Sequence, residues 1–216
     1  MPAARRERPR ACLAVLCSGQ GTNLQAIINA TRSGHIPARV GLVVSDRADA
    51  LALVRAKRAG IPAIFVDPKH FPDRAAFERR LIERIDQAGA KLICLAGFMR
   101  LLSRVFVRRF PHRILNIHPA LLPAFPGGQA VRDTLAWGAK VTGVTVHLVD
   151  EEVDHGPIVL QEALVIRPGE TASHLLSRLH HVEHRLYPVA IRLILTGKVR
   201  VEGRAVIVVP RARVRI

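Results

Sequence analysis

The stretch CLAVLCSGQGTNLQ, residues 12–25, joins an uninterrupted apolar run to a glycine-containing loop and then to the start of a helical pattern. A short apolar run of this kind is typical of a strand that is buried on both faces of a parallel sheet. Similar runs alternate with helical patterns along the first half of the chain. The apolar runs lie at 39–46, 63–67, 91–97 and 113–119, and the helical patterns lie at 23–34, 48–60, 73–89 and 98–110. The sequence therefore predicts an α/β fold with a mostly parallel twisted sheet flanked by helices.

The second half of the chain departs from this alternation. Two strand-like stretches, 141–150 and 157–166, follow each other with only a short loop between them. A long helix is expected from Thr171 to Gly197, and the pattern at 199–208 is typical of a small hairpin.

The length and composition of the chain predict one domain. A chain of 216 residues with 49% hydrophobic content is long enough to bury one sizeable core, so we expect a single domain over residues 1–216. The arginine-rich ends, residues 1–10 and 210–216, are expected to be flexible.

The chain is basic, with 33 Lys and Arg against 17 Asp and Glu and a formal net charge of +16. Because most of the cations are arginine, the composition suits phosphate or carboxylate ligands. It also raises the alternative of a nucleic-acid-binding protein. Aromatic residues make up only 4% of the chain and no known nucleic-acid motif appears, so this alternative ranks below an enzyme, and no specific nucleic-acid partner is expected.

The cysteines and the hydropathy pattern predict a cytoplasmic protein. Cys12, Cys17 and Cys94 show no paired spacing, which favours neither a disulfide framework nor a zinc site. The apolar run at 12–17 is shorter than the apolar region of a usual signal peptide, and no later run reaches transmembrane length. No membrane partner is expected.

The loop SGQGTNLQ, residues 18–25, is a candidate anion site because it follows a strand and opens a helix. It lacks the glycine spacing of dinucleotide-binding folds and the lysine of a Walker motif, so a whole nucleotide cofactor is not indicated. The glycines can equally serve a tight turn, with Thr22 or Asn23 as the N-cap of the helix, and the local sequence slightly favours that interpretation.

Asn116 and His118 stand two positions apart at the end of a predicted strand, so their side chains lie on the same face. The carboxyl ends of parallel strands are where α/β folds bind ligands, and an Asn beside a His can donate to a developing oxyanion. The stretch VDEEVDHGP, residues 149–157, is either a solvated turn or the source of a carboxylate, Asp154, that meets His118. Such a contact would orient the imidazole and raise its pKa.

Four motifs together carry a family resemblance: SGQGTNLQ at 18–25, AGFMRLL at 96–102, LNIHPALLPAFPG at 115–127 and VDEEVDHGPIVLQ at 149–161. In this order and at these separations the chain resembles the phosphoribosylglycinamide formyltransferases, from about Cys12 to about Val206. The resemblance implies a Rossmann-like formyltransferase fold and transfer of a formyl group from 10-formyltetrahydrofolate to the amine of glycinamide ribonucleotide. It implies no metal, and a monomer or homodimer.

The resemblance also assigns residues. The catalytic residues would be Asn116, His118 and Asp154. The ribonucleotide would be bound by Gly21, Thr22, Asn23 and Glu183, and the folate by Arg74, Met99, Arg100, Leu101, Leu102 and Asn116. By itself, Glu183 has the pattern of a solvated helical residue, and Met99–Leu102 have the pattern of a helix start.

The chain departs from the family pattern at Gln129, where a histidine is usual, and at His180, where a glutamine is common. A glutamine at 129 carries no proton at neutral pH, so an acid–base role there is in doubt.

Two relatives with similar chemistry remain as rivals. Hydrolases of 10-formyltetrahydrofolate carry an added N-terminal domain, whereas about ten residues precede the first predicted strand here. Methionyl-tRNA formyltransferases carry a further C-terminal domain. We therefore expect the small ribonucleotide enzyme rather than either of these.

Overall fold

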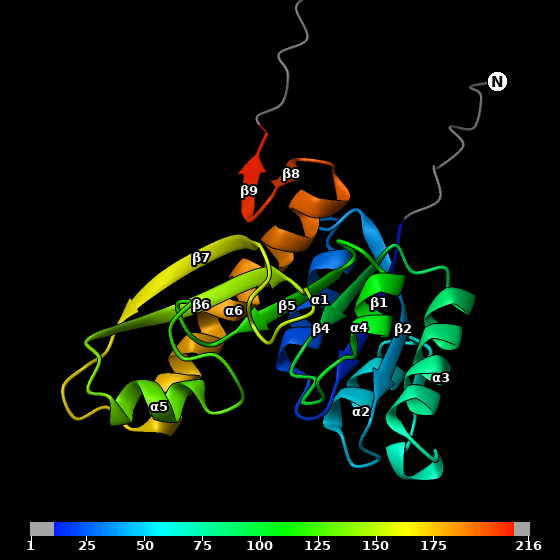
Figure 1. Ribbon diagram of the computed structural model, residues 1–216, viewed down its shortest axis with the longest axis horizontal. Coiled ribbons are helices and arrows are strands. Elements are labelled where there is room, and N and C mark those ends of the chain that lie inside the picture. Colours follow the sequence, from blue (N-terminus) through cyan, green and yellow to red (C-terminus); the bar gives the residue numbers. More distant parts are fainter. Residues whose placement is uncertain (1–10, 210–216) are drawn as a thin grey trace, which may run out of the picture.

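The computed structural model describes residues 11–209 and is built around a seven-stranded sheet (Figure 1). Its strand order is β3-β2-β1-β4-β5-β6-β7. The strands span Ala11–Cys17 (β1), Ala38–Ser45 (β2), Ala63–Phe65 (β3), Leu92–Leu95 (β4), Ile114–His118 (β5), Val141–Leu148 (β6) and Ile158–Val165 (β7). The pairs from β3 to β5 are parallel, and β6 and β7 extend the sheet with antiparallel pairs. The predicted mostly parallel sheet is confirmed.

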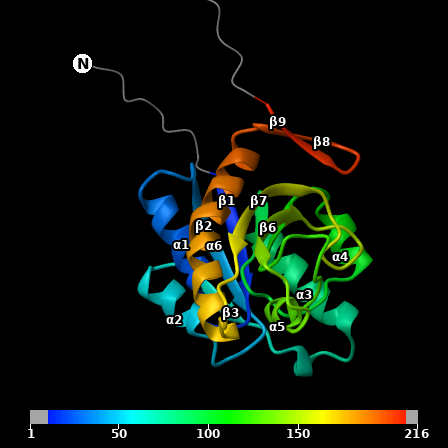
Figure 2. The same cartoon turned by 90° about the vertical axis from the view of Figure 1, so that its left-hand side faces the viewer.

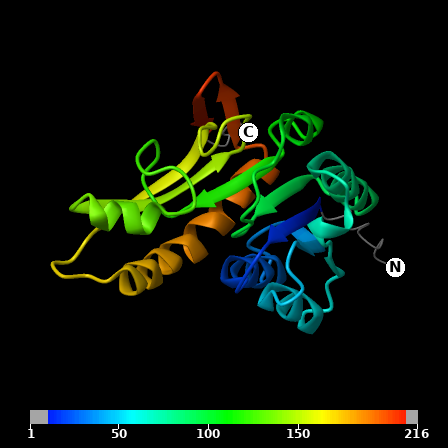
Figure 3. The ribbon, with the colours of Figure 1, turned by 60° about the horizontal axis from the view of Figure 1, so that its bottom comes forward.

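Helices cover both faces of this sheet (Figure 2). One face carries α1 (Thr22–Arg32), α2 (Leu51–Arg58) and the long α6 (Ala172–Leu195), and the other carries α3 (Arg74–Gln87) and α4 (Arg104–Arg109). Figure 3 shows α6 running obliquely along the sheet on the same side as α1. The remaining elements are a 3-10 turn (Pro68–His70), α5 (Ala130–Ala136), which packs on α6, and the hairpin β8 (Val199–Glu202) and β9 (Ala205–Val208).

The strands are buried on both faces because successive side chains enter different halves of the core. In β1, Leu13 and Val15 pack with residues of α1 and α6, whereas Ala14 and Leu16 pack with residues of α3 and α4. This explains why the strands appear in the sequence as continuous apolar runs rather than as alternating ones.

The pattern at 98–110 does not form one helix. The helix α4 begins only at Arg104, after Ser103, whose hydroxyl accepts the N–H of Phe106 as an N-cap. The buried carboxylate of Glu78 on α3 accepts the N–H of Ser103 at 2.8 Å, and this bond holds the preceding segment away from the helix. The expectation of a helix start at Met99–Leu102 was wrong, and those residues are free to line a cavity.

The predicted flexible ends, 1–10 and 210–216, lie outside the described residues. Within residues 11–209, no helix combines the length and the apolarity that crossing a membrane requires.

The strand order fixes where a ligand can bind. From β1 the chain proceeds to β2 and β3 on one side, and then returns to β4 and β5 on the other side of β1. Loops at the carboxyl ends of β1 and β4 therefore leave the sheet in opposite directions and open a crevice between them, the usual ligand position in such sheets.

Candidate active site

A cavity of about 240 Å³ lies at the carboxyl ends of β4 and β5 and is closed by the loop between β6 and β7. Asn116 and His118 line it from β5, and Asp154 lines it from the loop. Their neighbours Leu115 and Ile117 point into the core on the α1 and α6 face. The expected alternation along this strand is therefore confirmed.

Asp154 holds the polar groups of this cavity together. Its Oδ2 lies 3.3 Å from Nδ1 of His118 and accepts the backbone N–H of Gly127 at 2.7 Å. Its Oδ1 accepts a hydrogen bond from Nδ2 of Asn116 at 3.3 Å. Asp154 adopts φ 51°, an unusual backbone conformation for a residue other than glycine, so the loop holds its carboxylate against these three partners. The interpretation of this loop as a solvated turn was wrong for Asp154.

The environment of Asp154 keeps its carboxylate ionised. Burial would raise its pKa, but hydrogen bonds from His147 and Gly127, together with the charges of His118 and His147, lower the pKa to about 2. A carboxylate with so low a pKa is a weak base near neutral pH, so its main effect is on the groups that it orients.

His118 is held between two acceptors. Its Nε2 lies 2.8 Å from the carbonyl oxygen of Phe125, which can only accept, so this nitrogen carries a proton. Its Nδ1 faces the Asp154 carboxylate. Two acceptors suit a doubly protonated ring, yet burial lowers the pKa of His118 and outweighs the opposite effects of Asp154 and Phe125. The net pKa is therefore lowered by burial, although Asp154 itself acts in the expected direction and raises it.

We expect the titration of His118 to show both effects. In the free protein the NMR titration midpoint of its imidazole should lie below 6.5, because burial disfavours the charged ring. In Asp154→Asn the midpoint should move lower still, because the carboxylate is the group that stabilises the imidazolium. An unchanged midpoint in that variant would mean that Asp154 does not act on this ring.

His147 is a member of this cluster that the sequence analysis missed. It lies opposite Asn116 in the antiparallel pair of β5 and β6, with Nε2 3.2 Å from Asn116 Nδ2 and 3.5 Å from Asp154 Oδ1. Its Nδ1 lies 3.0 Å from the Leu148 carbonyl oxygen. The only signal in the sequence was one histidine in the apolar strand VTGVTVHL, and its partner depends on a register that the sequence does not give.

The contact with His147 also changes the expected state of Asn116. Its Nδ2 group donates to Oδ1 of Asp154 and lies 3.2 Å from Nε2 of His147, which can accept only when that nitrogen carries no proton. To donate to a substrate oxygen, the amide must turn, or the oxygen must replace one of these two neighbours. Asn116 is therefore already engaged, which the sequence does not show.

The loop at residues 18–23 is pinned to α2 through its carbonyl oxygens. The Gly19 oxygen accepts the N–H of Ala52 at 3.1 Å, and the Gln20 oxygen accepts Nε of Arg55 at 2.8 Å. In a trans peptide the N–H points opposite to the carbonyl, so the N–H groups of Gln20 and Gly21 point away from α2. This arrangement and the N-terminus of α1 leave a row of donors suited to an anion.

Gly21 is essential to this loop conformation. It is the N-cap of α1 with φ 69°, and no side chain caps the helix, so the expectation that Thr22 or Asn23 is the cap was wrong. A Cβ at Gly21 would lie 2.7 Å from Cα of Ala52, closer than such atoms approach. Glycine is thus required both for the turn and for the close approach to α2.

Asn23 and Glu183 lie side by side. Nδ2 of Asn23 donates to Oε2 of Glu183 at 2.8 Å, and Glu183 is buried, so it is not the solvated residue that its helical context suggested. Burial raises the pKa of Glu183 more than Asn23 and His180 lower it. These residues do not line the cavity of Asn116, His118 and Asp154, so as predicted ligand residues they would form a separate subsite.

The two departures from the family pattern lie outside the catalytic cavity. Gln129 is exposed at the start of α5. His180 stacks on His184 with ring centroids 6.0 Å apart, and its Nε2 lies 4.0 Å from Glu183. His180 therefore faces the subsite of Asn23 and Glu183.

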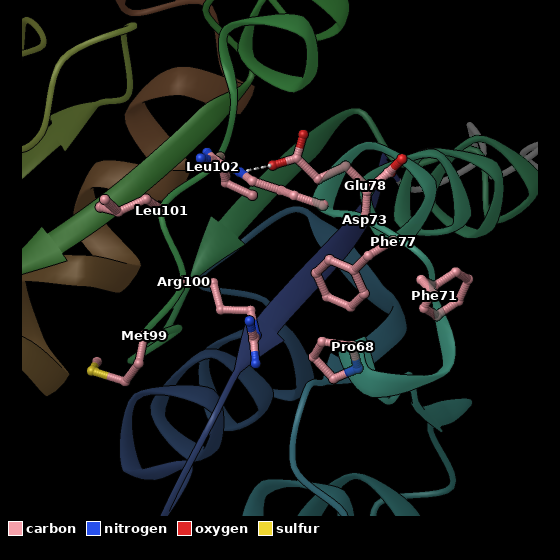
Figure 4. A pocket seen from close by; sticks show the side chains of 10 residues that line it. Pro68, Phe71, Asp73, Phe77, Glu78, Met99, Arg100, Leu101 and Leu102 are labelled. Carbon is pink, nitrogen blue, oxygen red and sulfur yellow. Dashed lines mark hydrogen bonds and ion pairs between the residues drawn. The ribbon is translucent and has the colours of Figure 1, made fainter.

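The predicted folate residues line two neighbouring cavities. Met99, Arg100, Leu101 and Leu102 border both the cavity of Asn116 and His118 and a second one of about 500 Å³. Arg74 lines only the second, where its Nε lies 3.0 Å from Oε1 of Glu78. Figure 4 shows this second cavity, with Glu78 and Leu102 labelled. Met99 and Leu101 are 71% and 62% exposed, so a ligand can still cover them. Arg74 does not line the cavity of Asn116, His118 and Asp154.

Within residues 11–209, no three His, Cys, Asp or Glu side chains are arranged to hold a metal ion. That the chemistry needs no metal stays a prediction.

Comparison with known proteins places the chain in a family. A family model described as formyl transferase matches residues 11–191. The trifunctional purine biosynthetic protein adenosine-3 of Gallus gallus is 46% identical over 189 residues, which are 88% of this chain but only 19% of that protein. The phosphoribosylglycinamide formyltransferase of Haemophilus influenzae is 41% identical over 88% of this chain and 90% of its own length.

Solved structures agree with these relatives. The crystal structure of glycinamide ribonucleotide transformylase 1 from Symbiobacterium toebii superposes with a TM-score of 0.92 at 51% identity, covering 93% of this chain and 95% of that one. Phosphoribosylglycinamide formyltransferase from Coxiella burnetii gives 0.87 at 40% identity, over 93% and 94%. With its sheet, its cavity and these matches, the chain belongs to the formyl transferase family.

Proposed function

We propose that this chain transfers the formyl group of 10-formyltetrahydrofolate to the primary amine of glycinamide ribonucleotide, a step of purine biosynthesis. The observation that carries the proposal is the cluster of Asn116, His118 and Asp154 in one cavity, adjacent to an anion-binding loop. The names of the relatives and of the matching structures support it.

The cavity suits the pterin end of a folate. Its lining includes the apolar residues Leu95, Leu102 and Val149 together with the polar groups of Asn116, His118 and Asp154. A planar heteroaromatic ring fits such a site, since apolar walls bury its faces while a few polar groups orient it. The exposed Met99 and Leu101 would close over the ring from the adjoining segment.

The ribonucleotide would bind on the other side of the catalytic residues. Its phosphate would lie on the backbone N–H groups of Gly21, Thr22 and Asn23, and the carboxylate of Glu183 would accept hydrogen bonds from the ribose hydroxyls. This placement directs the amine toward His118 and the formyl carbon.

The reaction forms one C–N bond and breaks another. The amine attacks the formyl carbon, giving a tetrahedral oxyanion, and collapse of this intermediate expels the folate nitrogen, which takes the proton lost by the amine. Asn116 and protonated His118 would donate to the oxyanion as its charge develops, His118 through Nε2 once the oxyanion replaces the Phe125 oxygen there, while Nδ1 stays on Asp154. Asp154 stays ionised and acts by orienting His118 and by stabilising its charged form.

The proton balance of His118 sets a condition on this mechanism. Burial lowers the pKa of His118 in the free protein, so the imidazolium becomes dominant only if substrate binding stabilises it. The oxyanion supplies a second negative charge beside the ring, which favours the protonated form in the transition state more than in the ground state.

The test is a formyl-transfer assay with the purified full chain. With 10-formyltetrahydrofolate and glycinamide ribonucleotide, tetrahydrofolate and the formylated ribonucleotide should appear together, and without the ribonucleotide the folate should stay formylated. Turnover that is equal with and without ribonucleotide would make the chain a hydrolase.

A chelator in a parallel reaction should leave the rate unchanged, and loss of activity that a divalent ion restores would overturn the metal-free mechanism.

A further inference from the structure

A hydrogen-bonded link joins the anion-binding loop to the segment that borders the cavity. Oγ of Ser18 donates to Oδ1 of Asp46 at 2.6 Å and accepts the backbone N–H of Met99 at 3.0 Å. The backbone N–H of Ser18 donates to the Gly97 oxygen at 3.0 Å. Ser18 is thus fixed from both sides where the anion-binding loop begins.

The second oxygen of Asp46 holds an arginine of the same segment. Nε of Arg100 lies 2.8 Å from Oδ2 of Asp46, and its guanidinium carbon lies 5.6 Å from the centroid of the Phe77 ring. Figure 4 shows Arg100 between the segment and Phe77, with Met99 and Leu101 turned to the other side. The side chain of Asp46 is only 7% exposed, so this pair is less screened than a surface pair.

The two segments depend on this link because neither has regular secondary structure. Residues 96–103 follow β4 without forming a helix, and residues 18–21 precede α1. A largely buried carboxylate whose two oxygens serve different segments loses both partners at once when it is removed, which is more costly than the loss of an exposed contact.

We propose that Asp46 is a positioning residue that couples the two substrate subsites of this enzyme. The inference rests on the proposed function, since it assigns the ribonucleotide to the loop at 18–23 and the folate to the segment at 97–102. A folate that covers the segment fixes Met99 and Arg100, and through Asp46 it fixes Ser18 and the start of the loop. When the second substrate binds, less conformational entropy is lost, so its affinity is higher. By linkage, each substrate raises the affinity for the other by the same factor.

The test measures this coupling without turnover. Tetrahydrofolate has no formyl group to transfer, so no turnover occurs when it is bound. The dissociation constant of glycinamide ribonucleotide can therefore be measured by calorimetry without tetrahydrofolate and with saturating tetrahydrofolate. In the wild-type chain we expect tetrahydrofolate to tighten ribonucleotide binding by about fivefold or more, within the usual range of coupling between sites.

Two variants break the link at different points. In Asp46→Asn the side chain keeps an oxygen for Ser18 but turns an amide toward Arg100, so that contact is lost. Ser18→Ala removes the other contact and the acceptor for Met99. In each variant the tightening should fall to less than about twofold. The double variant should show no further loss of tightening beyond the more strongly affected single variant, since both changes act on one link.

The control is Asp49→Asn, which removes the same charge three positions away. Asp49 is exposed. Within residues 11–209, its side chain pairs only with the exposed Arg47. This variant should keep the wild-type tightening. Melting temperatures of all variants report general destabilisation, which would weaken ribonucleotide binding equally with and without tetrahydrofolate and so leave the tightening unchanged.

The outcomes separate the inference from the function on which it rests. If the wild-type chain binds neither ligand, the proposed function fails. If it binds both ligands but shows no tightening, or if Asp46→Asn keeps the wild-type tightening, the function stands and the role of Asp46 is wrong. Loss of tightening in Asp46→Asn and Ser18→Ala, but not in Asp49→Asn, supports it.

Discussion

Replacing Asp154 with asparagine is expected to lower kcat by roughly 10²- to 10⁴-fold, the usual loss for a group that acts through an acid–base partner. The variant keeps the shape of the side chain but removes the charge 3.3 Å from Nδ1 of His118. The imidazolium then loses its counter-charge in a buried site where burial already disfavours it. The affinity for the ribonucleotide should barely change, because Asp154 lies outside its subsite.

The His118→Ala variant should cost a similar factor, and the double variant should be little worse than either single one. Residues that act as a unit do not give additive losses. Asp49→Asn is the control for removal of a carboxylate charge, since Asp49 pairs with Arg47 at the surface and does not line the cavity of His118. Losses from the two catalytic variants that multiply would mean that His118 and Asp154 act independently.

The second large effect is expected at Gly21. Gly21→Ala should weaken ribonucleotide binding by about tenfold or more, because a residue with a side chain pays roughly 1–2 kcal/mol at positive φ. The added Cβ would also meet Ala52, so the loop must move away from α2 and its donors lose their common direction. Gly21→Asp adds a negative charge where we propose that the phosphate binds and should be worse still.

Gly34→Ala provides the control for this backbone effect. Gly34 lies just beyond α1 with φ 77°, and a Cβ there would meet nothing within 4 Å. It carries the same conformational cost without the clash and away from the subsite, so it should lower stability but leave ribonucleotide affinity unchanged. An equal loss of folate and ribonucleotide affinity in Gly21→Ala would place the phosphate elsewhere.

Local patterns predicted most of the sheet because its strands are buried on both faces. Leu13, Ala14, Val15 and Leu16 are all apolar for that reason, and such runs differ plainly from helical periods. The placement of Asn116 and His118 on one face followed from the two-residue period of a strand. Their meeting with Asp154 rested on the family resemblance, since spacing alone does not bring residues 118 and 154 together.

The misses share a physical cause, which is that each depends on contacts between segments far apart in the sequence. The pattern at 98–110 predicts one helix, but the helix begins only after Ser103, whose N–H donates to Glu78, a residue 25 positions earlier. His147 joins the cluster only through the register of β5 and β6. The lowered pKa of His118 reflects burial by the whole fold, which no local motif reports.

The most direct measurement follows the transferred carbon. A single turnover with 10-formyltetrahydrofolate carrying ¹³C in the formyl group, in the presence of glycinamide ribonucleotide, should place the label in the new amide of the ribonucleotide and none in formate. The Asp154→Asn and His118→Ala variants should form the same labelled product, only far more slowly. Label released as formate by the wild-type chain, or transfer at an unchanged rate in both variants, would contradict formyl transfer at this site.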